Sequence, residues 1–124
     1  MFRVIIAGGR DFDNYDLLKQ KMDYLLSETT EPIRVVCGQA RGADQLGQLY
    51  AKERGYEIRY YPANWEYYGK KAGPLRNEQM AQNADALVAF WDGESRGTKN
   101  MIENAKKYKL KIRIVRYRRE AVPC

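Results

Sequence analysis

The sequence predicts an α/β protein, a single Rossmann-like three-layer sandwich in which about five parallel strands alternate with four helices. Short apolar runs rich in β-branched residues alternate with longer amphipathic runs along the 124 residues. This alternation is typical of a sheet with helical crossovers. The length suits one domain. No internal repeat, low-complexity segment or linker divides the chain.

The first two strands flank an amphipathic helix. Residues 2–7 form an apolar strand. Residues 14–28 form a helix with Asp13 or Asn14 as its N-cap, because their apolar side chains fall on one stripe. That stripe consists of Leu18, Met22, Leu25 and Leu26. Residues 33–37 are an unbroken apolar run, as expected of a strand that is covered on both faces.

The remaining elements follow in the same alternation. Gly55 suits the end of a helix, and Pro74 suits the first turn of another. Thr98 is expected to be the N-cap of the last helix. Residues 63–73 contain two glycines and three aromatic residues and are expected to form a longer connection. We therefore expect helices at 43–54, 74–83 and 98–108, and strands at 56–61, 86–91 and 111–115.

The composition excludes several chemistries. Because histidine is absent, there is no Ser-His-Asp or Cys-His relay, no H-E-x-x-H metal site and no imidazole proton shuttle. The two cysteines, Cys37 and Cys124, cannot form a four-ligand structural zinc site. The first apolar run is too short for a signal peptide, and no run approaches a membrane span. We expect a reduced, cytoplasmic protein without a cofactor, a metal or a membrane partner.

The positive charge lies near the C-terminus. The net charge is +6, but residues 106–119 hold eight basic and no acidic side chains, which leaves −2 for the rest. Lysines at a helix end and basic residues on an edge strand explain most of this stretch as a solvated surface. The basic cluster of Arg116, Arg118 and Arg119 could instead contact nucleic acid. We expect a domain at 1–116 and a basic tail at 117–124.

Glycine-rich loops predict the position of a ligand site. Eight of the ten glycines lie in four loops between a strand and the next helix, and such loops gather at the carboxyl edge of a parallel sheet. Glycine lets a ligand approach the backbone, and helix N-termini bind anions. Three of these loops also contain an arginine, namely Arg10, Arg41 and Arg96. Because arginine suits phosphate oxygens, we expect a small ligand that carries phosphate.

Four motifs in order give the chain a resemblance to a known family. They are GGRDF at 8–12, GQARGAD at 38–44, GESRGTKNM at 93–101, and P-A-x-W-x-x-x-G-x-x-A-G-x-x-R-N-x-x-M at 62–80. The sequence resembles the SLOG superfamily, which unites the Smf/DprA and LOG proteins, and within it the YspA-like, YpsA-related branch. This resemblance covers about residues 3–116. It implies strand order 3-2-1-4-5, a pocket for nucleotides or ADP-ribose-like derivatives, and a homo-oligomer.

The resemblance and the loop chemistry together give a set of expected ligand-binding residues. The set is Gly8, Gly9, Arg10, Asp11, Gly38, Ala40, Arg41, Gly42, Ala43, Asp44, Trp65, Arg76, Asn77, Gly93, Arg96, Gly97 and Thr98. Asp44 either binds ribose hydroxyls or only complements its own helix dipole. Trp65, Tyr67 and Tyr68 either stack on a base or pack in the core or against another subunit. Arg76 contacts phosphate or ribose if its helix face meets the pocket.

One position departs from the family's hydrolases. LOG enzymes carry P-G-G-x-G-T-x-x-E, and the position of that glutamate is Met101 here. Asp44, Glu78 or Glu103 could supply a carboxylate instead. The leading hypothesis is therefore binding of a nucleotide-derived ligand, for sensing or sequestering a signalling molecule. An N-glycosidase acting on nucleotides and a single-strand nucleic-acid binder, as in the DprA relatives, are the alternatives.

Overall fold

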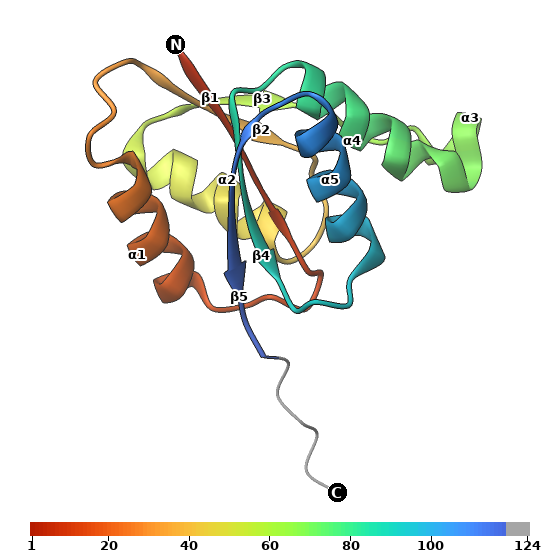
Figure 1. Cartoon of the computed structure of the whole chain (residues 1–124), viewed down its shortest axis with the longest axis horizontal. Helices are drawn as coiled ribbons and strands as arrows, with labels where there is room; N and C mark the ends of the chain where they lie inside the picture. Colours follow the sequence, from red (N-terminus) through yellow and green to blue (C-terminus); the bar gives the residue numbers. More distant parts are fainter. Residues whose placement is uncertain (119–124) are drawn as a thin grey trace, which may run out of the picture.

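One parallel sheet in the order β3-β2-β1-β4-β5 organises the protein (Figure 1). The computed structural model describes residues 1–118. The strands are β1 (Phe2–Gly8), β2 (Ile33–Cys37), β3 (Glu57–Tyr60), β4 (Ala86–Trp91) and β5 (Lys111–Arg116). β1 lies at the centre and pairs with β2 on one side and β4 on the other. The α/β class and the strand order expected from the sequence are both confirmed.

Helices cover both faces of the sheet. They are α1 (Tyr15–Leu26), α2 (Ala43–Arg54), α3 (Trp65–Tyr68), α4 (Ala72–Gln82) and α5 (Arg96–Lys107). α1 and α2 lie on one face and α4 and α5 on the other, while the short α3 projects beyond the body (Figure 1). This arrangement completes the three-layer sandwich that the alternating pattern predicts.

The side-chain alternation of the central strand divides the core into two parts. Val4 and Ile6 belong to the cluster that packs against α1 and α2, whereas Ile5 and Ala7 belong to the cluster with α4 and α5. Successive strand residues point to opposite faces, so a continuous apolar run serves both layers. β1 is thereby buried between two hydrophobic layers, and this packing fixes the position of its carboxyl end.

Two local predictions are wrong. The segment expected as a connection at 63–73 contains α3, a 3-10 turn (Gly69–Lys71) and the first two residues of α4. The last helix begins at Arg96 with Ser95 as its N-cap, so Thr98 lies inside the first turn. Thr98 does not cap the helix, because the Ser95 side chain accepts from the Thr98 N–H at 3.4 Å.

Other helix ends follow the sequence signals. Asn14 caps α1, its side chain accepting a hydrogen bond from the Leu17 N–H at 3.1 Å. Gly55 ends α2 in the left-handed region at φ +71°, where glycine carries no steric penalty. Observed boundaries otherwise differ from the expected ones by a residue or two, which is ordinary fraying at element ends.

β5 is an edge strand whose outer side chains are largely basic, as expected. At its end, Arg116 lies over the Trp91 ring, with the guanidinium carbon 5.5 Å from the ring centroid. Tyr117, the first residue of the expected tail, packs edge-on against Phe12. Arg119 and Cys124, which the sequence singled out, lie outside the described residues. Within residues 1–118, no helix is both long and apolar enough to cross a lipid bilayer.

Candidate functional site

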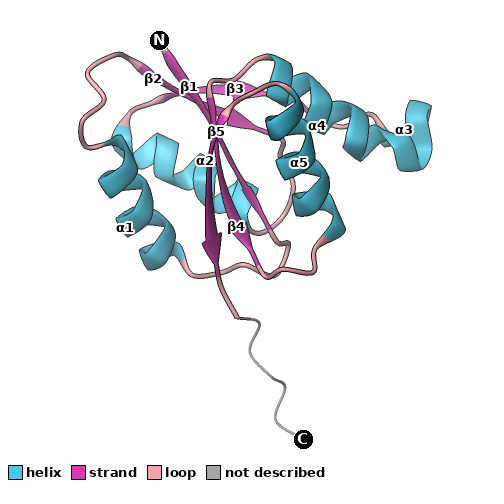
Figure 2. Cartoon of the chain, in the orientation of Figure 1, coloured by secondary structure: helices cyan, strands magenta, loops and turns pink. Residues whose placement is uncertain are grey.

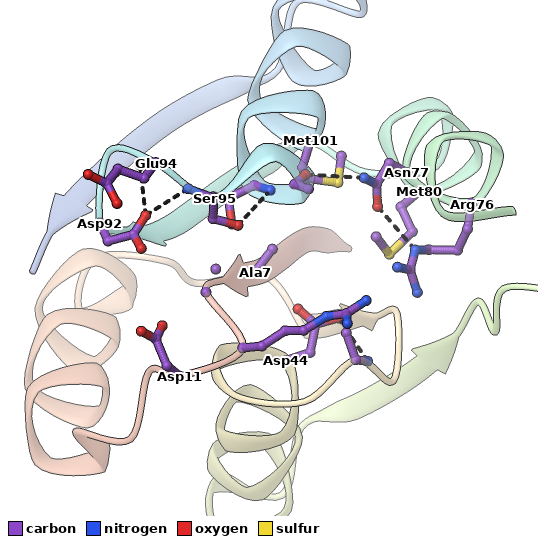
Figure 3. A pocket seen from close by; sticks show the side chains of 16 residues that line it. Ala7, Asp11, Asp44, Arg76, Asn77, Met80, Asp92, Glu94, Ser95 and Met101 are labelled. Atoms are coloured by element: carbon purple, nitrogen blue, oxygen red, sulfur yellow. Dashed lines mark hydrogen bonds between the residues drawn. The ribbon is translucent and has the colours of Figure 1, made fainter. Parts of the chain in front are cut away.

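The loops that lead from strands into helices gather at the carboxyl edge of the sheet (Figure 2). A cavity of about 550 Å³ opens at this edge (Figure 3). We name it the main cavity. It lies between β1, the start of α2, α4 and the start of α5. Its volume is in the range of small-molecule sites. The lining residues are Ala7, Gly8, Gly9, Arg10, Asp11, Ala40, Asp44, Arg76, Asn77, Met80, Asp92, Glu94, Ser95, Gly97, Thr98 and Met101.

The start of α5 forms one wall of the main cavity. The Asp92 carboxylate accepts hydrogen bonds from the backbone N–H groups of Glu94 and Ser95, each at 2.8 Å, and fixes the turn before the helix. The Ser95 and Thr98 hydroxyl oxygens lie 3.0 Å apart. A methyl group added to Gly97 would meet no atom within 4 Å, so its backbone is open to a ligand. This wall is suited to an anion, because a helix N-terminus carries partial positive charge.

The opposite wall contains the buried Asp44 carboxyl and the partly buried Arg76 guanidinium. Asp44, the second residue of α2, is 5% exposed, and burial raises the pKa of its carboxyl to about 6. The nearby Arg76 guanidinium and the Ala40 N–H, which donates to Asp44 at 3.4 Å, oppose this rise. Burial also lowers the pKa of Arg76, while Asp44 raises it. Asp44 and Arg76 thus place one acceptor and one donor group at the same cavity.

Gly38 lies between these two side chains, at the end of β2. The Arg76 guanidinium donates a hydrogen bond to the Gly38 carbonyl oxygen. A methyl group added to Gly38 would lie 2.7 Å from Arg76 Nη1 and 2.9 Å from Asp44 Oδ2. A side chain at this position would therefore push apart the groups that line the cavity, and this explains the glycine.

α4 supplies a second polar residue beside Arg76. Asn77 is 7% exposed, and its side-chain oxygen accepts a hydrogen bond from Arg76 Nε at 3.0 Å. Its amide nitrogen donates to Asn100 Oδ1 at 3.0 Å and to the Gly97 carbonyl at 3.4 Å. Asn77 therefore ties the arginine to α5 and sets the distance between two walls of the site.

The loop after β1 is packed too closely for side chains. A Cβ on Gly8 would collide with the Phe90 carbonyl of β4, and one on Gly42 would collide with the Gly9 carbonyl. Gly42 also has φ +79°, in the left-handed region that favours glycine. These glycines bring the loops of β1 and β2 together. They give the loops their close packing, and Gly42 itself lines no described cavity.

The structure brings ten of the seventeen expected residues to the main cavity. They are Gly8, Gly9, Arg10, Asp11, Ala40, Asp44, Arg76, Asn77, Gly97 and Thr98. Three others, Gly38, Arg41 and Trp65, line a neighbouring cavity of about 370 Å³. The remaining four, Gly42, Ala43, Gly93 and Arg96, line none of the described cavities.

Six lining residues were not among the expected ligand-binding residues. They are Ala7, Met80, Asp92, Glu94, Ser95 and Met101. Asp92 and Ser95 carry a signal that the sequence does show, since both are good turn and cap residues directly after a strand. Ala7 and Met80 carry none, because apolar residues at these positions look like ordinary core.

Of the three carboxylates considered for catalysis, only Asp44 lines the main cavity. Glu78 forms an exposed ion pair with Lys107 at 3.0 Å, and Glu103 is exposed on α5. Met101 is 2% exposed and lines the cavity at the position where LOG enzymes carry glutamate. Among residues 1–118, no three His, Cys, Asp or Glu side chains come together as a metal site.

Two solved structures share this fold. DNA processing protein A (DprA) from Streptococcus pneumoniae superimposes with a TM-score of 0.70 at 14% identity, over 91% of this chain and 49% of that one. The chain thus spans about half the length of that protein. TM1055 superimposes with a TM-score of 0.66 at 17% identity, over 90% of this chain and 72% of that one. At such identities the likeness shows the fold alone.

Sequence comparison gives the closer relationship. The Gene 61 protein of Mycobacterium phage D29 is 34% identical over 113 residues, which cover 86% of this chain and 90% of that protein. The model of the YspA, cpYpsA-related SLOG family matches residues 2–68, a segment that contains the first two glycine loops and Asp44. The chain belongs to the YspA, cpYpsA-related SLOG family.

Proposed function

We propose that this protein binds a small ligand that contains a phosphorylated ribose, such as an ADP-ribose derivative, and senses or sequesters it. One observation carries the proposal: the main cavity combines the open start of α5, the Arg76 guanidinium and the buried Asp44 carboxyl. Helix N-termini and arginine bind phosphate, and a carboxylate accepts hydrogen bonds from sugar hydroxyls. Family membership supports a nucleotide-type ligand.

The phosphate is assigned to the first turn of α5. Gly97 leaves its backbone open there, and Thr98 and Ser95 add two hydroxyl groups to the same wall. Arg76 reaches the cavity from α4 and is held by Asn77 and the Gly38 carbonyl. An arginine held by two partners loses little further freedom when it binds an anion.

Binding without cleavage is the form of the function that we favour. The apolar Met101 occupies the position of the hydrolase glutamate and faces the cavity. A thioether can neither stabilise an oxocarbenium-like transition state nor move a proton. N-glycosidic hydrolysis is the second candidate, because Asp44 places one carboxyl with a pKa of about 6 in the same cavity.

Titration calorimetry tests the binding proposal. The panel is ADP-ribose, NAD, cyclic ADP-ribose isomers, nucleoside monophosphates and ribose 5-phosphate. We expect at least one to bind with a Kd below about 1 mM, and we expect Arg76→Ala to weaken it at least tenfold, about 1.4 kcal/mol. The absence of binding by every compound contradicts the proposal. Base release that Asp44→Asn abolishes would instead establish the hydrolase.

We also propose that the protein is a homo-oligomer. The short α3 projects from the body (Figure 1), and it carries two exposed aromatic side chains, Tyr67 and Tyr68, that line none of the described cavities. Exposed apolar clusters of this kind are typical of protein contacts. Sedimentation equilibrium over a hundredfold range of concentration tests this, with Tyr68→Ser as the variant expected to shift the protein toward monomer. A single monomeric species at every concentration contradicts it.

A further inference from the structure

A second cavity adjoins the main cavity and shares three of its residues. We name it the side cavity; its volume is about 370 Å³. Arg10, Ala40 and Arg76 line both cavities, so the two spaces meet at these residues. The side cavity extends from that boundary over the loop after β2 to the connection before α4. Its remaining lining residues are Gly38, Gln39, Arg41, Pro62, Ala63 and Trp65.

The two cavities differ in charge. Four carboxylate residues, Asp11, Asp44, Asp92 and Glu94, line the main cavity together with two arginines. Three arginines and no acidic residue line the side cavity. No ion pair within residues 1–118 includes Arg10 or Arg41. Arg10 and Arg41 therefore offer two charges to an anion in the side cavity, whereas the charge of Arg76 also interacts with Asp44.

Trp65 gives the side cavity an aromatic wall. The far edge of its indole packs on α4, where a methyl group on Gly73 would lie 3.2 Å from the ring. The residue is nevertheless 51% exposed, so contact with α4 leaves much of the ring open. An indole that is held on one side and open on the other suits stacking with a planar ring.

We propose that the side cavity binds the nucleobase end of a two-unit nucleotide, whose phosphorylated ribose occupies the main cavity. The inference rests on the proposed function. Of the two phosphates that link the sugars, one lies at the start of α5 and the other at Arg10 and Arg76, because these two arginines line both spaces. The base stacks on Trp65 beside Arg41. The ligand class is thus a nucleoside diphosphate joined to a second sugar, and a single ribose phosphate fills only the main cavity.

The test compares two probes on the same protein. Ribose 5-phosphate occupies the main cavity alone, whereas ADP-ribose occupies both. We expect ADP-ribose to bind at least tenfold more tightly, as measured by calorimetry. Trp65→Ala is expected to weaken ADP-ribose by about 5- to 150-fold, the equivalent of 1–3 kcal/mol for one base stack. Its affinity for ribose 5-phosphate should not change.

Matched variants separate this effect from general damage. Tyr24→Ala removes an aromatic ring from α1, where Tyr24 is 76% exposed and lines none of the described cavities. Arg41→Ala removes a charge from the side cavity and should weaken ADP-ribose binding. Arg113→Ala is its control, because it removes the same charge from the exposed edge of β5. Both controls should bind ADP-ribose as the wild type does. Trp65→Phe keeps a ring and should retain most of the affinity that Trp65→Ala loses.

The outcomes distinguish the two proposals. If ribose 5-phosphate binds and ADP-ribose binds no more tightly, the side cavity is not a base site, although the main cavity keeps its function. The same conclusion follows if Trp65→Ala weakens both probes equally. If neither probe binds and the rest of the panel also fails, the proposed function and this inference fall together.

Discussion

Asp44 is the residue at which folding and binding make opposite demands. Its carboxyl is buried at the start of α2, and burial raises its pKa from 3.8 to about 6. The ionised form, which in the proposed complex accepts hydrogen bonds from a ligand, is therefore less stable in the folded protein than in water. A residue chosen only for folding would be neutral here. Its presence supports the proposal that ligand binding, rather than packing, determines this position.

The consequence is a pH-dependent gain in stability for Asp44→Asn. Above about pH 6 the wild-type carboxyl is ionised both folded and unfolded, and the folded state bears the cost of burial. The free energy of unfolding of the variant should then exceed that of the wild type by on the order of 3 kcal/mol, which corresponds to the difference between a pKa of 3.8 and one of about 6. Below about pH 3 the carboxyl is neutral in both states, because this pH is below the unfolded pKa of 3.8, so the gain should vanish. Urea denaturation at pH 3 and pH 8 measures the difference.

Asp23→Asn is the matched control, and its expected change in the free energy of unfolding has the opposite sign. Arg54 holds the pKa of Asp23 below its usual value, and Tyr50 contributes a hydrogen bond of 2.6 Å. This carboxylate stabilises the folded state when ionised, so its replacement should lower stability at pH 8 and have less effect at pH 3. Equal shifts for the two variants at pH 8 would contradict the assignment of burial as the cause at Asp44.

A second prediction at the scale of single residues concerns Gly38. A methyl group there would lie within 3.0 Å of both Arg76 and Asp44, closer than a Cβ normally approaches. Gly38→Ala should therefore move Arg76 and weaken ligand binding at least tenfold, the loss of about 1.4 kcal/mol. Gly55→Ala offers the contrast, because Gly55 has open space but φ +71°. That variant should lose stability through backbone strain and bind ligand unchanged, as calorimetry and thermal denaturation would show.

At the scale of elements, helix caps separate stability from binding. Ser95 caps α5 beside the main cavity, and Asn14 caps α1 away from it. Replacing either with alanine should cost about 1 kcal/mol of stability. Only Ser95→Ala should also weaken phosphate-containing ligands, since it removes a hydroxyl group from the cavity wall. Denaturation and calorimetry on both variants test this; a comparable loss of affinity in Asn14→Ala would show that general destabilisation is responsible.

The elements themselves could largely be predicted from hydrophobic pattern, with two instructive failures. α3 is four residues long, which is too short for a helical period to appear in the sequence. The sequence predicts too late a start for α5, because Ser95 and Thr98 are both good N-cap residues and lie only three residues apart. The choice depends on Asp92, whose carboxylate holds the backbone of Ser95 in the capping geometry.

The candidate site could be predicted in outline for a topological reason. Loops after parallel strands meet at one edge of the sheet, so the sequence alone predicts that their glycines and Asp44 lie close together. The sequence does not predict that Met80 and Ala7 line the cavity, because this depends on the direction in which each side chain points. The division into two cavities was also beyond the sequence. The two cavities meet at Arg10, which comes from the loop after β1, and at Arg76, which comes from α4.

At the scale of the whole molecule, ligand binding should offset the cost of the site. Burial destabilises the ionised Asp44 carboxyl. Gln39, in the loop between β2 and α2, has a φ of +60°, which is unfavourable for a residue other than glycine. A ligand that binds only the folded state adds about 2.7 kcal/mol at a concentration one hundred times its Kd. For a chain of 124 residues, that amounts to roughly 10 °C in Tm.

The distribution of this stabilisation identifies its source. Hydrogen exchange should slow most at the amides of the α5 start and of the loop after β2, because the ligand contacts them in the proposed complex, and less in the buried strand β4. Asp44→Asn should begin with a higher Tm than the wild type at pH 8 and gain less from the same ligand, since it lacks both the folding cost and the acceptor. A variant with a higher starting Tm and an undiminished ligand increment would show that Asp44 costs stability without serving the site.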